Sequence, residues 1–359
     1  ATGGRKNMVY NGAMKVAQRG TSTTGITSGG YFTCDRWRFS SNIGTFTQTQ
    51  STDVPTGQGF ATSMKLDCTT AESSISAIDD LILLSQRFEG QDLQHLKKGT
   101  ANAESLTASF WVKSNKTGTY VLEQYDTDNG RIISKSYTID TANTWEKKTI
   151  SYAGDTTGAY GNDNNGSLRF NFWLGAGTFY SSGTLATDWR TYTNTVRAAG
   201  VVNLGDSTAN NFYITGVQLE VGSVATDFEH RSYGEELALC QRYFQSSFPT
   251  GVAIGNGGNL SPTADGHGSL TAFNASSARS DLFHFSCEMR ATPTVTLYSA
   301  NSADTNSRWG RYTGSAWVSA GSNTPKPTSK YMHVEEDTSG MTAGYSYLMR
   351  GMWSVDAEL

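Results

Sequence analysis

The sequence predicts an all-β protein, built as a jelly-roll β-sandwich, a short helical linker and a second, smaller β-sandwich. Glycine contributes 38 of the 359 residues and only 17% of residues are charged, a composition that suits many short strands joined by turns. Several segments alternate apolar and polar residues with a period of two, as half-buried strands do. Aromatic residues make up 11% of the chain, which is enough large apolar surface to offset the entropy of ordering it.

The strand pattern is clearest in residues 168–174. Phe170 and Phe172 alternate there with Asn171 and Trp173, so the two pairs point to opposite faces of the strand. Similar segments occur at residues 105–113, 120–125, 131–137, 145–152, 212–221, 269–273 and 293–298. Strands at this spacing, with no helical period between them, indicate a sandwich or a jelly roll.

Three local signals refine the prediction. Asp126–Gly130 ends in Asn-Gly and predicts a hairpin turn. Gly216 interrupts the alternation of its strand, as a β-bulge would. Ser232 and Glu235 have the spacing of a capping box, and apolar residues follow them at helical intervals. We therefore expect a short helix between two β domains.

These signals divide the chain into four parts. We expect an N-terminal attachment arm over residues 1–30, the jelly roll over 31–230, the helical linker over 231–248 and the second sandwich over 249–359. The arm is expected because its apolar patch, which contains Met8, Tyr10 and Met14, is too short to form a core of its own. Deletion of the arm is then expected to leave both sandwiches folded.

Charge and hydropathy exclude several classes of protein. The 28 Lys and Arg against 32 Asp and Glu give a net charge of −4, and no basic run exceeds a Lys pair, so we expect no nucleic-acid partner. No stretch of about 18 apolar residues is present, so we expect no membrane insertion. The polar first residues predict no signal peptide. The four cysteines are widely spaced, and we expect thiols in a protein folded in a reducing cytoplasm.

The sequence contains no recognisable catalytic pattern. The five histidines are isolated from one another, and adjacent acids such as Asp79 and Asp80 point to opposite faces of a strand, whereas glycoside hydrolysis needs two facing carboxyls. The acidic turns at 126–130 and 163–166 lack the trailing Glu of a calcium loop, so plain Asx turns are favoured over a bound cation. We expect no catalytic residues, no metal and no cofactor.

Aromatic side chains are the candidates for binding. Sugar rings stack on aromatic faces, and Trp111 and Trp173 lie opposite the apolar stripe of their strands, although packing at a subunit interface is an alternative. The loops of residues 249–359 set Trp309, Tyr312 and Trp317 among Ser, Asn and Gly, which is typical of binding loops. We expect recognition mainly in this C-terminal domain, with hairpin turns whose aromatics fill a subunit interface as the alternative.

Several strings of the sequence resemble one family. They are Val9–Met14, Tyr31–Trp37, Phe212–Gly222, Ala225–Glu229 and Tyr233–Tyr243. Together they resemble bacteriophage tail-fibre and related virion structural proteins that have a jelly roll like that of carbohydrate-binding modules. The resemblance spans about residues 7–245. The C-terminal part matches more loosely, mainly in its closing residues 353–359.

The resemblance implies a place on the phage particle and no defined activity. It implies a virion structural protein, a fibre or spike made in the host cytoplasm, whose partners are other virion proteins and a glycan of the host cell surface. We expect a homotrimer, because phage fibres are generally threefold and closed symmetry pairs off β-edges. The alternatives are a capsid or collar fibre without a recognition role, a glycan-cleaving tailspike and a secreted carbohydrate-binding module.

Overall fold

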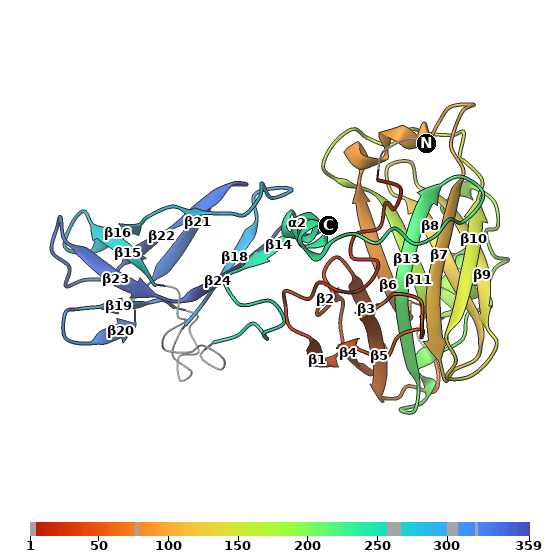
Figure 1. Cartoon of the computed structure of the whole chain (residues 1–359), viewed down its shortest axis with the longest axis horizontal. Coiled ribbons are helices and arrows are strands. Elements are labelled where there is room, and N and C mark those ends of the chain that lie inside the picture. The colour runs from red at the N-terminus through yellow and green to blue at the C-terminus, as the bar shows by residue number, and fades with distance from the viewer. Residues whose placement is uncertain (1–4, 76–78, 257–266, 300–307, 320–321) are drawn as a thin grey trace. The chain divides into compact units, whose positions relative to one another are not determined.

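The computed structural model describes residues 5–75, 79–256, 267–299, 308–319 and 322–359. They divide into two compact units (Figure 1). The first unit holds residues 5–17, 21–236 and 359, and the second holds residues 18–20 and 237–358. The division falls inside the predicted linker, residues 231–248. The strands of both units pair antiparallel and their helices are few and short, which confirms the predicted all-β fold.

The first unit is a sandwich of two sheets (Figure 1). The six-stranded sheet has the order β1 (Ser22–Ile26), β4 (Thr45–Ser51), β5 (Ser63–Thr70), β13 (Asn211–Val221), β7 (Leu106–Ser114) and β10 (Glu146–Tyr152). The seven-stranded sheet has the order β12 (Arg190–Thr191), β9 (Arg131–Ile139), β8 (Gly118–Asp126), β11 (Gly166–Ala176), β6 (Leu81–Glu89), β3 (Arg38–Ser41) and β2 (Gly30–Tyr31). The short helices of this unit are η1 (Gly90–Leu96), α1 (Thr178–Ser181), η2 (Asn194–Val196) and η3 (Leu204–Asp206).

The space between these sheets is filled largely by aromatic rings. Phe110 of β7 meets Phe172 of β11 edge to face, with ring centroids 5.2 Å apart. Phe170 packs on Phe172 in the same way. Asn171 and Trp173 leave the opposite face of β11, as the alternation predicted. The inner face of the seven-stranded sheet therefore packs in the core, and the side chains of its outer face do not.

The predicted turn, bulge and helix cap are all present. Gly130, with φ of 59°, closes the hairpin between β8 and β9. Gly216, with φ of 61°, lies where β13 loses register with β7. At the start of α2 (Tyr233–Gln241), the amide of Glu235 donates to Ser232 Oγ at 3.2 Å, and Ser232 N donates to Glu235 Oε2 at 2.9 Å. These reciprocal bonds are the predicted capping box.

The N-terminal segment belongs to the first sandwich. Val9 and Met14 are fully buried in its core, and Met8 packs against the edge of that core. The side chain of Tyr10 is 9% exposed. Its backbone exchanges two hydrogen bonds of 2.8 Å with the side chain of Gln86 on β6.

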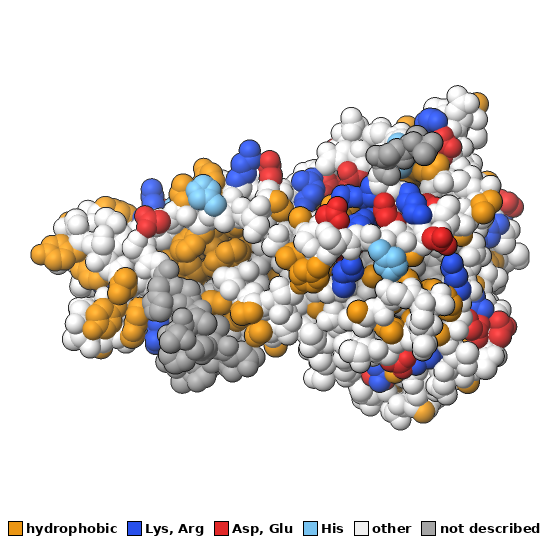
Figure 2. Space-filling model, in the orientation of Figure 1, with side chains coloured by type: hydrophobic (Ala, Val, Ile, Leu, Met, Phe, Trp, Pro, Cys, Tyr) orange, Lys and Arg blue, Asp and Glu red, His pale blue; other side chains and the backbone are white. Residues whose placement is uncertain are grey.

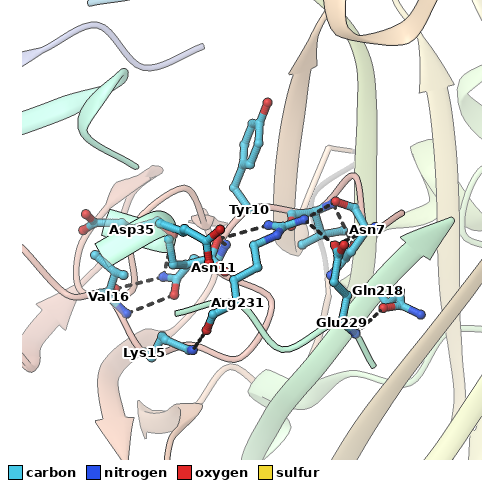
Figure 3. Close-up of polar contacts among 12 residues, drawn as sticks. Asn7, Tyr10, Asn11, Lys15, Val16, Asp35, Gln218, Glu229 and Arg231 are labelled. Atoms are coloured by element: carbon cyan, nitrogen blue, oxygen red, sulfur yellow. Dashed lines mark hydrogen bonds and ion pairs between the residues drawn. The ribbon is translucent and has the colours of Figure 1, made fainter. Parts of the chain in front are cut away.

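Polar contacts fix the same segment from both sides (Figure 3). The guanidinium of Arg231 donates to the carbonyl oxygens of Asn7 and Val9. The side chain of Asn11 donates to the carbonyl of Val16 at 2.8 Å and accepts from the amide of that residue at 3.0 Å. The structure thus differs from the predicted attachment arm, because a short apolar patch needs no core of its own when it completes that of a sandwich.

The second unit is smaller and has two sheets around one core. The three-stranded sheet has the order β14 (Phe244–Ser246), β24 (Met352–Asp356) and β18 (Thr294–Tyr298). The other sheet has the order β17 (Phe283–His284), β22 (Tyr331–Asp337), β16 (Ser277–Ser280), β15 (His267–Ala272), β23 (Ser346–Arg350), β19 (Gly310–Tyr312) and β20 (Trp317–Ser319), and β21 (Asn323–Pro327) pairs with β22. Figure 2 shows apolar side chains exposed on this unit. Large exposed ones include Phe273, Leu282, Tyr345 and Leu348.

Two further observations concern the whole chain. None of the helices in the described part of the chain is long and apolar enough to cross a membrane. The four cysteines are thiols, of which Cys34, Cys68 and Cys240 are buried and Cys287 is partly buried. Burial raises the pKa of Cys34 to about 12, so this thiol stays protonated at neutral pH.

Candidate functional site

A cavity of about 420 Å³ lies on the outer face of the seven-stranded sheet. Its floor comes from β3, β6 and β11, and residues 27–29, Tyr180 and Arg197 form its walls. The volume is within the range of small-molecule sites, roughly 300–1,000 Å³. The sandwich therefore offers a ligand-sized hollow on the face that its core does not use.

Strand register sets the residues of the floor in rows. One row runs from Arg38 through Ser85 to Asn171, because these residues are paired across β3, β6 and β11. In the next row Arg87 of β6 lies directly opposite Arg169 of β11. Neighbouring positions on one face of an antiparallel pair bring side chains within contact. The register thus gathers three arginines from distant parts of the sequence.

A buried ion pair lies at one end of the floor. Arg197 donates from Nε to Glu123 Oε1 at 2.7 Å and from Nη2 to Glu123 Oε2 at 2.8 Å. The carboxylate also accepts from Asn171 Nδ2 at 2.7 Å and from Trp173 Nε1 at 3.2 Å. Burial by itself would lower the pKa of Arg197, but Glu123 raises it well above its ordinary value. The hydrogen bonds that Glu123 accepts from Arg197, Asn171 and Trp173 hold the floor in place.

One polar atom of the floor lacks a protein partner. The Asn171 side chain is 1% exposed, and its Oδ1 makes no hydrogen bond with any described residue. A buried acceptor left in this way costs about 1–3 kcal/mol. Asn171 lines the cavity, so a hydroxyl group bound there would satisfy the atom.

Aromatic side chains form one wall. Tyr180, half-buried, packs on Trp173 at 5.1 Å between ring centroids, and Phe179, 37% exposed, meets Tyr180 edge to face. Trp173 lines the cavity but is only 1% exposed, since α1 and residues 185–201 cover it. Contrary to the prediction, Trp173 offers no open ring face, and Tyr180 is the aromatic group nearest to that role.

The other predicted aromatics lie apart from this cavity. Trp111 is half-buried on the outer face of the six-stranded sheet, opposite Lys147 of β10. Trp309, 3% exposed, belongs to the core of the second unit and donates from Nε1 to the carbonyl of Met352 at 2.9 Å. A buried indole with a satisfied N–H cannot serve as a platform, so the prediction does not hold for Trp309.

Tyr312 and Trp317 are brought together by the structure. They are cross-strand partners on β19 and β20, with ring centroids 5.4 Å apart, and both are half-buried. The guanidinium of Arg350 lies 4.6 Å from the Trp317 ring centroid. The loop predicted to carry Trp309 and Tyr312 spans residues 301–312, and its residues 301–307 lie outside the described residues.

Acidic and metal-ligating side chains were also candidates for a site. In the part of the chain that the structure describes, no three His, Cys, Asp or Glu side chains gather where they could hold a metal ion. Of the adjacent acids, Glu335 pairs with Arg279 at the surface, whereas Glu336 is buried beside Arg311. They point to opposite faces of β22, as neighbouring strand residues must.

The sequence did not single out the arginines of the cavity. Arg169 and Asn171 alternate visibly with the core residues of β11, and this was the one available signal. Their partners Arg38 and Arg87 lie on other strands, and the strand order that unites them cannot be read from local alternation.

Comparisons with solved structures find matches, whereas comparisons with family models and with curated proteins find none. Among solved structures, the enzymatically active domain of tailspike protein 4 of bacteriophage CBA120 has a TM-score of 0.32 and 16% identity, over 60% of this chain and 21% of that one. A protein of Bacteroides thetaiotaomicron described as a "putative sugar binding protein" has a TM-score of 0.32 and 13% identity, over 60% of this chain and 100% of that one.

A third structure is a family 22 carbohydrate-binding module of Clostridium thermocellum. It has a TM-score of 0.28 and 12% identity, over 59% of this chain and 100% of that one. TM-scores this low do not support an assignment of function.

Proposed function

We propose that this chain is a structural protein of a bacteriophage particle that binds a glycan of the host surface in the cavity of its first unit. The cavity carries the glycan part of the proposal. It combines an aromatic wall at Tyr180, guanidinium donors and the buried acceptor Asn171 Oδ1. Sugars present an apolar C–H face and a ring of hydroxyls, and this combination suits both.

The virion part of the proposal rests on the strings that resemble phage fibre proteins. The chain is then a fibre or spike on the particle surface, made in the host cytoplasm, bound to other virion proteins and assembled as a homotrimer. Sedimentation of the purified protein gives the number of chains. Antibody labelling of particles in electron micrographs gives the position, and absence of label on the particle would contradict the proposal.

We also propose that the protein binds without cleaving. The pair Glu123 and Arg197 is buried and fully engaged, so Glu123 is not free to act as an acid or a base. Incubation with host polysaccharide is expected to release no reducing ends over hours. Release that disappears in a single Asp or Glu variant would show an enzyme instead.

A second candidate surface for glycan binding lies in the second unit. The half-buried pair Tyr312 and Trp317, with Arg350 beside it, is an aromatic surface in the domain where the sequence predicted recognition. The two surfaces are separated by competition: full-length protein is added to host cells before phage, and phage adsorption is counted. Tyr180→Ala is expected to abolish the competition, and Tyr233→Ala, an exposed tyrosine outside the cavity, is the control. If Trp317→Ala abolishes competition and Tyr180→Ala does not, the site lies in the second unit.

A further inference from the structure

The cavity is lined by several arginines and by no acidic side chain. Among its lining residues, all of them described, are Arg38, Arg87, Arg169 and Arg197, and none is Asp or Glu. The carboxylate of Glu123, which contacts the lining, is 0% exposed and already accepts two hydrogen bonds from Arg197. Arg197 is therefore paired with a carboxylate, whereas Arg38 and Arg169 form no ion pair with any described residue.

The arrangement of two of these arginines is unfavourable for the protein alone. Arg87 and Arg169 are directly opposite each other on antiparallel strands, where like charges destabilise the pairing. Burial lowers the pKa of the Arg169 guanidinium, and the charges of Arg87 and Arg197 lower it further. Within the described part of the chain, Arg169 makes no hydrogen bond or ion pair; its guanidinium lies 5.5 Å from the ring centroid of Tyr125.

An anion in the cavity would relieve this arrangement. Guanidinium groups bind carboxylate and sulfate through two parallel N–H···O bonds, and a partly buried site strengthens such bonds. The rest of the floor suits the uncharged part of a sugar. Ser40 and Ser85 supply hydroxyls, and Asn171 Oδ1 supplies an acceptor for a ligand hydroxyl.

We infer that the glycan taken by the cavity is acidic, with a carboxylate or sulfate group bound by Arg38 and Arg169 and its hydroxyls bound by Asn171. This inference rests on the proposed function and names the chemical class of its ligand. Carboxylate and sulfate are the two sources of the same charge, and the experiment below separates them.

The test is calorimetric titration of the full chain with matched polysaccharides. Polygalacturonate and alginate supply carboxylates and chondroitin sulfate supplies both groups, and each is paired with its carboxyl-reduced or desulfated form. The acidic form is expected to bind at least tenfold more tightly than its neutral partner. Its affinity is expected to fall as salt rises, because the contacts are between charges. If carboxyl reduction abolishes binding, the group recognised is a carboxylate; if desulfation abolishes it, the group is a sulfate.

Variants show whether the arginines are responsible. Arg169→Gln and Arg38→Gln are each expected to weaken binding of the acidic form tenfold or more. Arg279→Gln, at an exposed ion pair of the second unit, is the matched control and is expected to change nothing. Arg169→Gln is also expected not to lower the melting temperature, since it removes a repulsion between Arg169 and Arg87. Substitution of an arginine that only stabilises the fold would lower the melting temperature.

The outcomes separate this inference from the proposed function. Equal binding of acidic and neutral forms, abolished by Tyr180→Ala, would overturn the inference and support a neutral glycan in the same cavity. Acidic binding that Arg169→Gln and Arg38→Gln leave intact would overturn it too, because the charge would be recognised elsewhere. Binding of no polysaccharide of either kind would count against the glycan site as a whole.

Discussion

Trp173 alternates with Phe172 and Leu174 along β11, and this pattern predicted that its side chain leaves the core. The direction is confirmed, yet the ring is covered by α1 and the residues that follow it. A period of two reports which face a side chain takes, because it is a property of the strand. Exposure depends on which distant segment lies over that face, and local sequence does not contain that information.

The Arg197 and Glu123 pair provides the first prediction. Arg197→Met is expected to destabilise the first unit by about 3–5 kcal/mol, because it leaves a buried carboxylate without its counter-charge. Unfolding in urea followed by intrinsic fluorescence measures the loss. The double variant Arg197→Met with Glu123→Gln is expected to recover much of it. If the double variant is no more stable than Arg197→Met alone, the arginine stabilises the unit through packing and not through charge.

At the scale of elements, the alternation, the Asn-Gly turn, the Gly216 bulge and the capping box were all predictable, because each depends on residues close in sequence. The cavity was not predictable, since its floor joins β3, β6 and β11, whose order follows from the folded sheet. The position of the N-terminal segment in the core was not predicted for a related reason, and its role in attachment stays a prediction. Its apolar patch was judged alone, whereas it is buried against β6 and β13.

Lys98 gives the second prediction, which concerns the loops around β8. Its ammonium lies 2.6 Å from Asp126 Oδ2 and 3.1 Å from Asp155 Oδ2, and it donates to the carbonyls of Thr157 and Gly158 at 2.8 Å. Two carboxylates and two carbonyls are also the oxygens that Ca²⁺ prefers. Lys98→Ala is therefore expected to destabilise the unit by about 3–5 kcal/mol.

Added calcium is expected to restore part of the loss in Lys98→Ala, since it can occupy the vacated position. Thermal melts with and without millimolar CaCl₂ measure this. Lys98→Met, which fills the space, is the control and is expected to gain nothing from calcium. Equal responses of Lys98→Ala and Lys98→Met would show that the oxygen cluster is not preorganised for a cation.

The third prediction concerns the N-terminal segment. Met14→Ala is expected to cost about 2–5 kcal/mol because Met14 is fully buried, and Met8→Ala less because Met8 is half-buried.

Glu229 makes the stability of the same segment depend on pH. Burial alone would raise its pKa, but the amides of Asn7 and Lys6 and the Arg231 guanidinium lower it below its usual value.

A carboxylate with a depressed pKa contributes stability above its unfolded pKa, about 4.3, and loses it as the pH falls through the folded value. The free energy of unfolding is therefore expected to fall less between pH 6 and pH 3 in Glu229→Gln than in the parent. Urea titrations at the two pH values test this. Parallel losses in both proteins would mean that Glu229 is no more stabilised in the folded state than in the unfolded chain.

At the scale of the whole molecule, the division into two β units was predictable because a helix cap interrupts the strand pattern between them. Two details were not. Residues 18–20 belong to the second unit although they are distant from it in sequence, and Leu359 belongs to the first. In the first unit, the hydroxyl of Tyr31 donates to the carbonyl of Leu359 at 2.9 Å. Segments that pack in a unit distant in sequence leave no periodic signal when they are only a few residues long.

Arg19 gives the last prediction, because it stabilises the second unit from the other end of the sequence. Its guanidinium lies 3.1 Å from Asp356, 3.3 Å from Glu358 and 3.6 Å from the ring centroid of Phe244. The side chain of Glu358 is only 4% exposed, so Arg19→Ala is expected to destabilise this unit by about 2–4 kcal/mol.

Hydrogen exchange followed by mass spectrometry locates the effect, since exchange reports local opening. Arg19→Ala is expected to speed exchange in residues 237–358 and to leave the strands of the first sandwich unchanged. Arg279→Gln, which removes an exposed ion pair of the same unit, is expected to cost under about 0.5 kcal/mol and serves as the control. Faster exchange throughout the chain would show that the two units do not open separately, and no change in residues 237–358 would show that Arg19 does not stabilise the second unit.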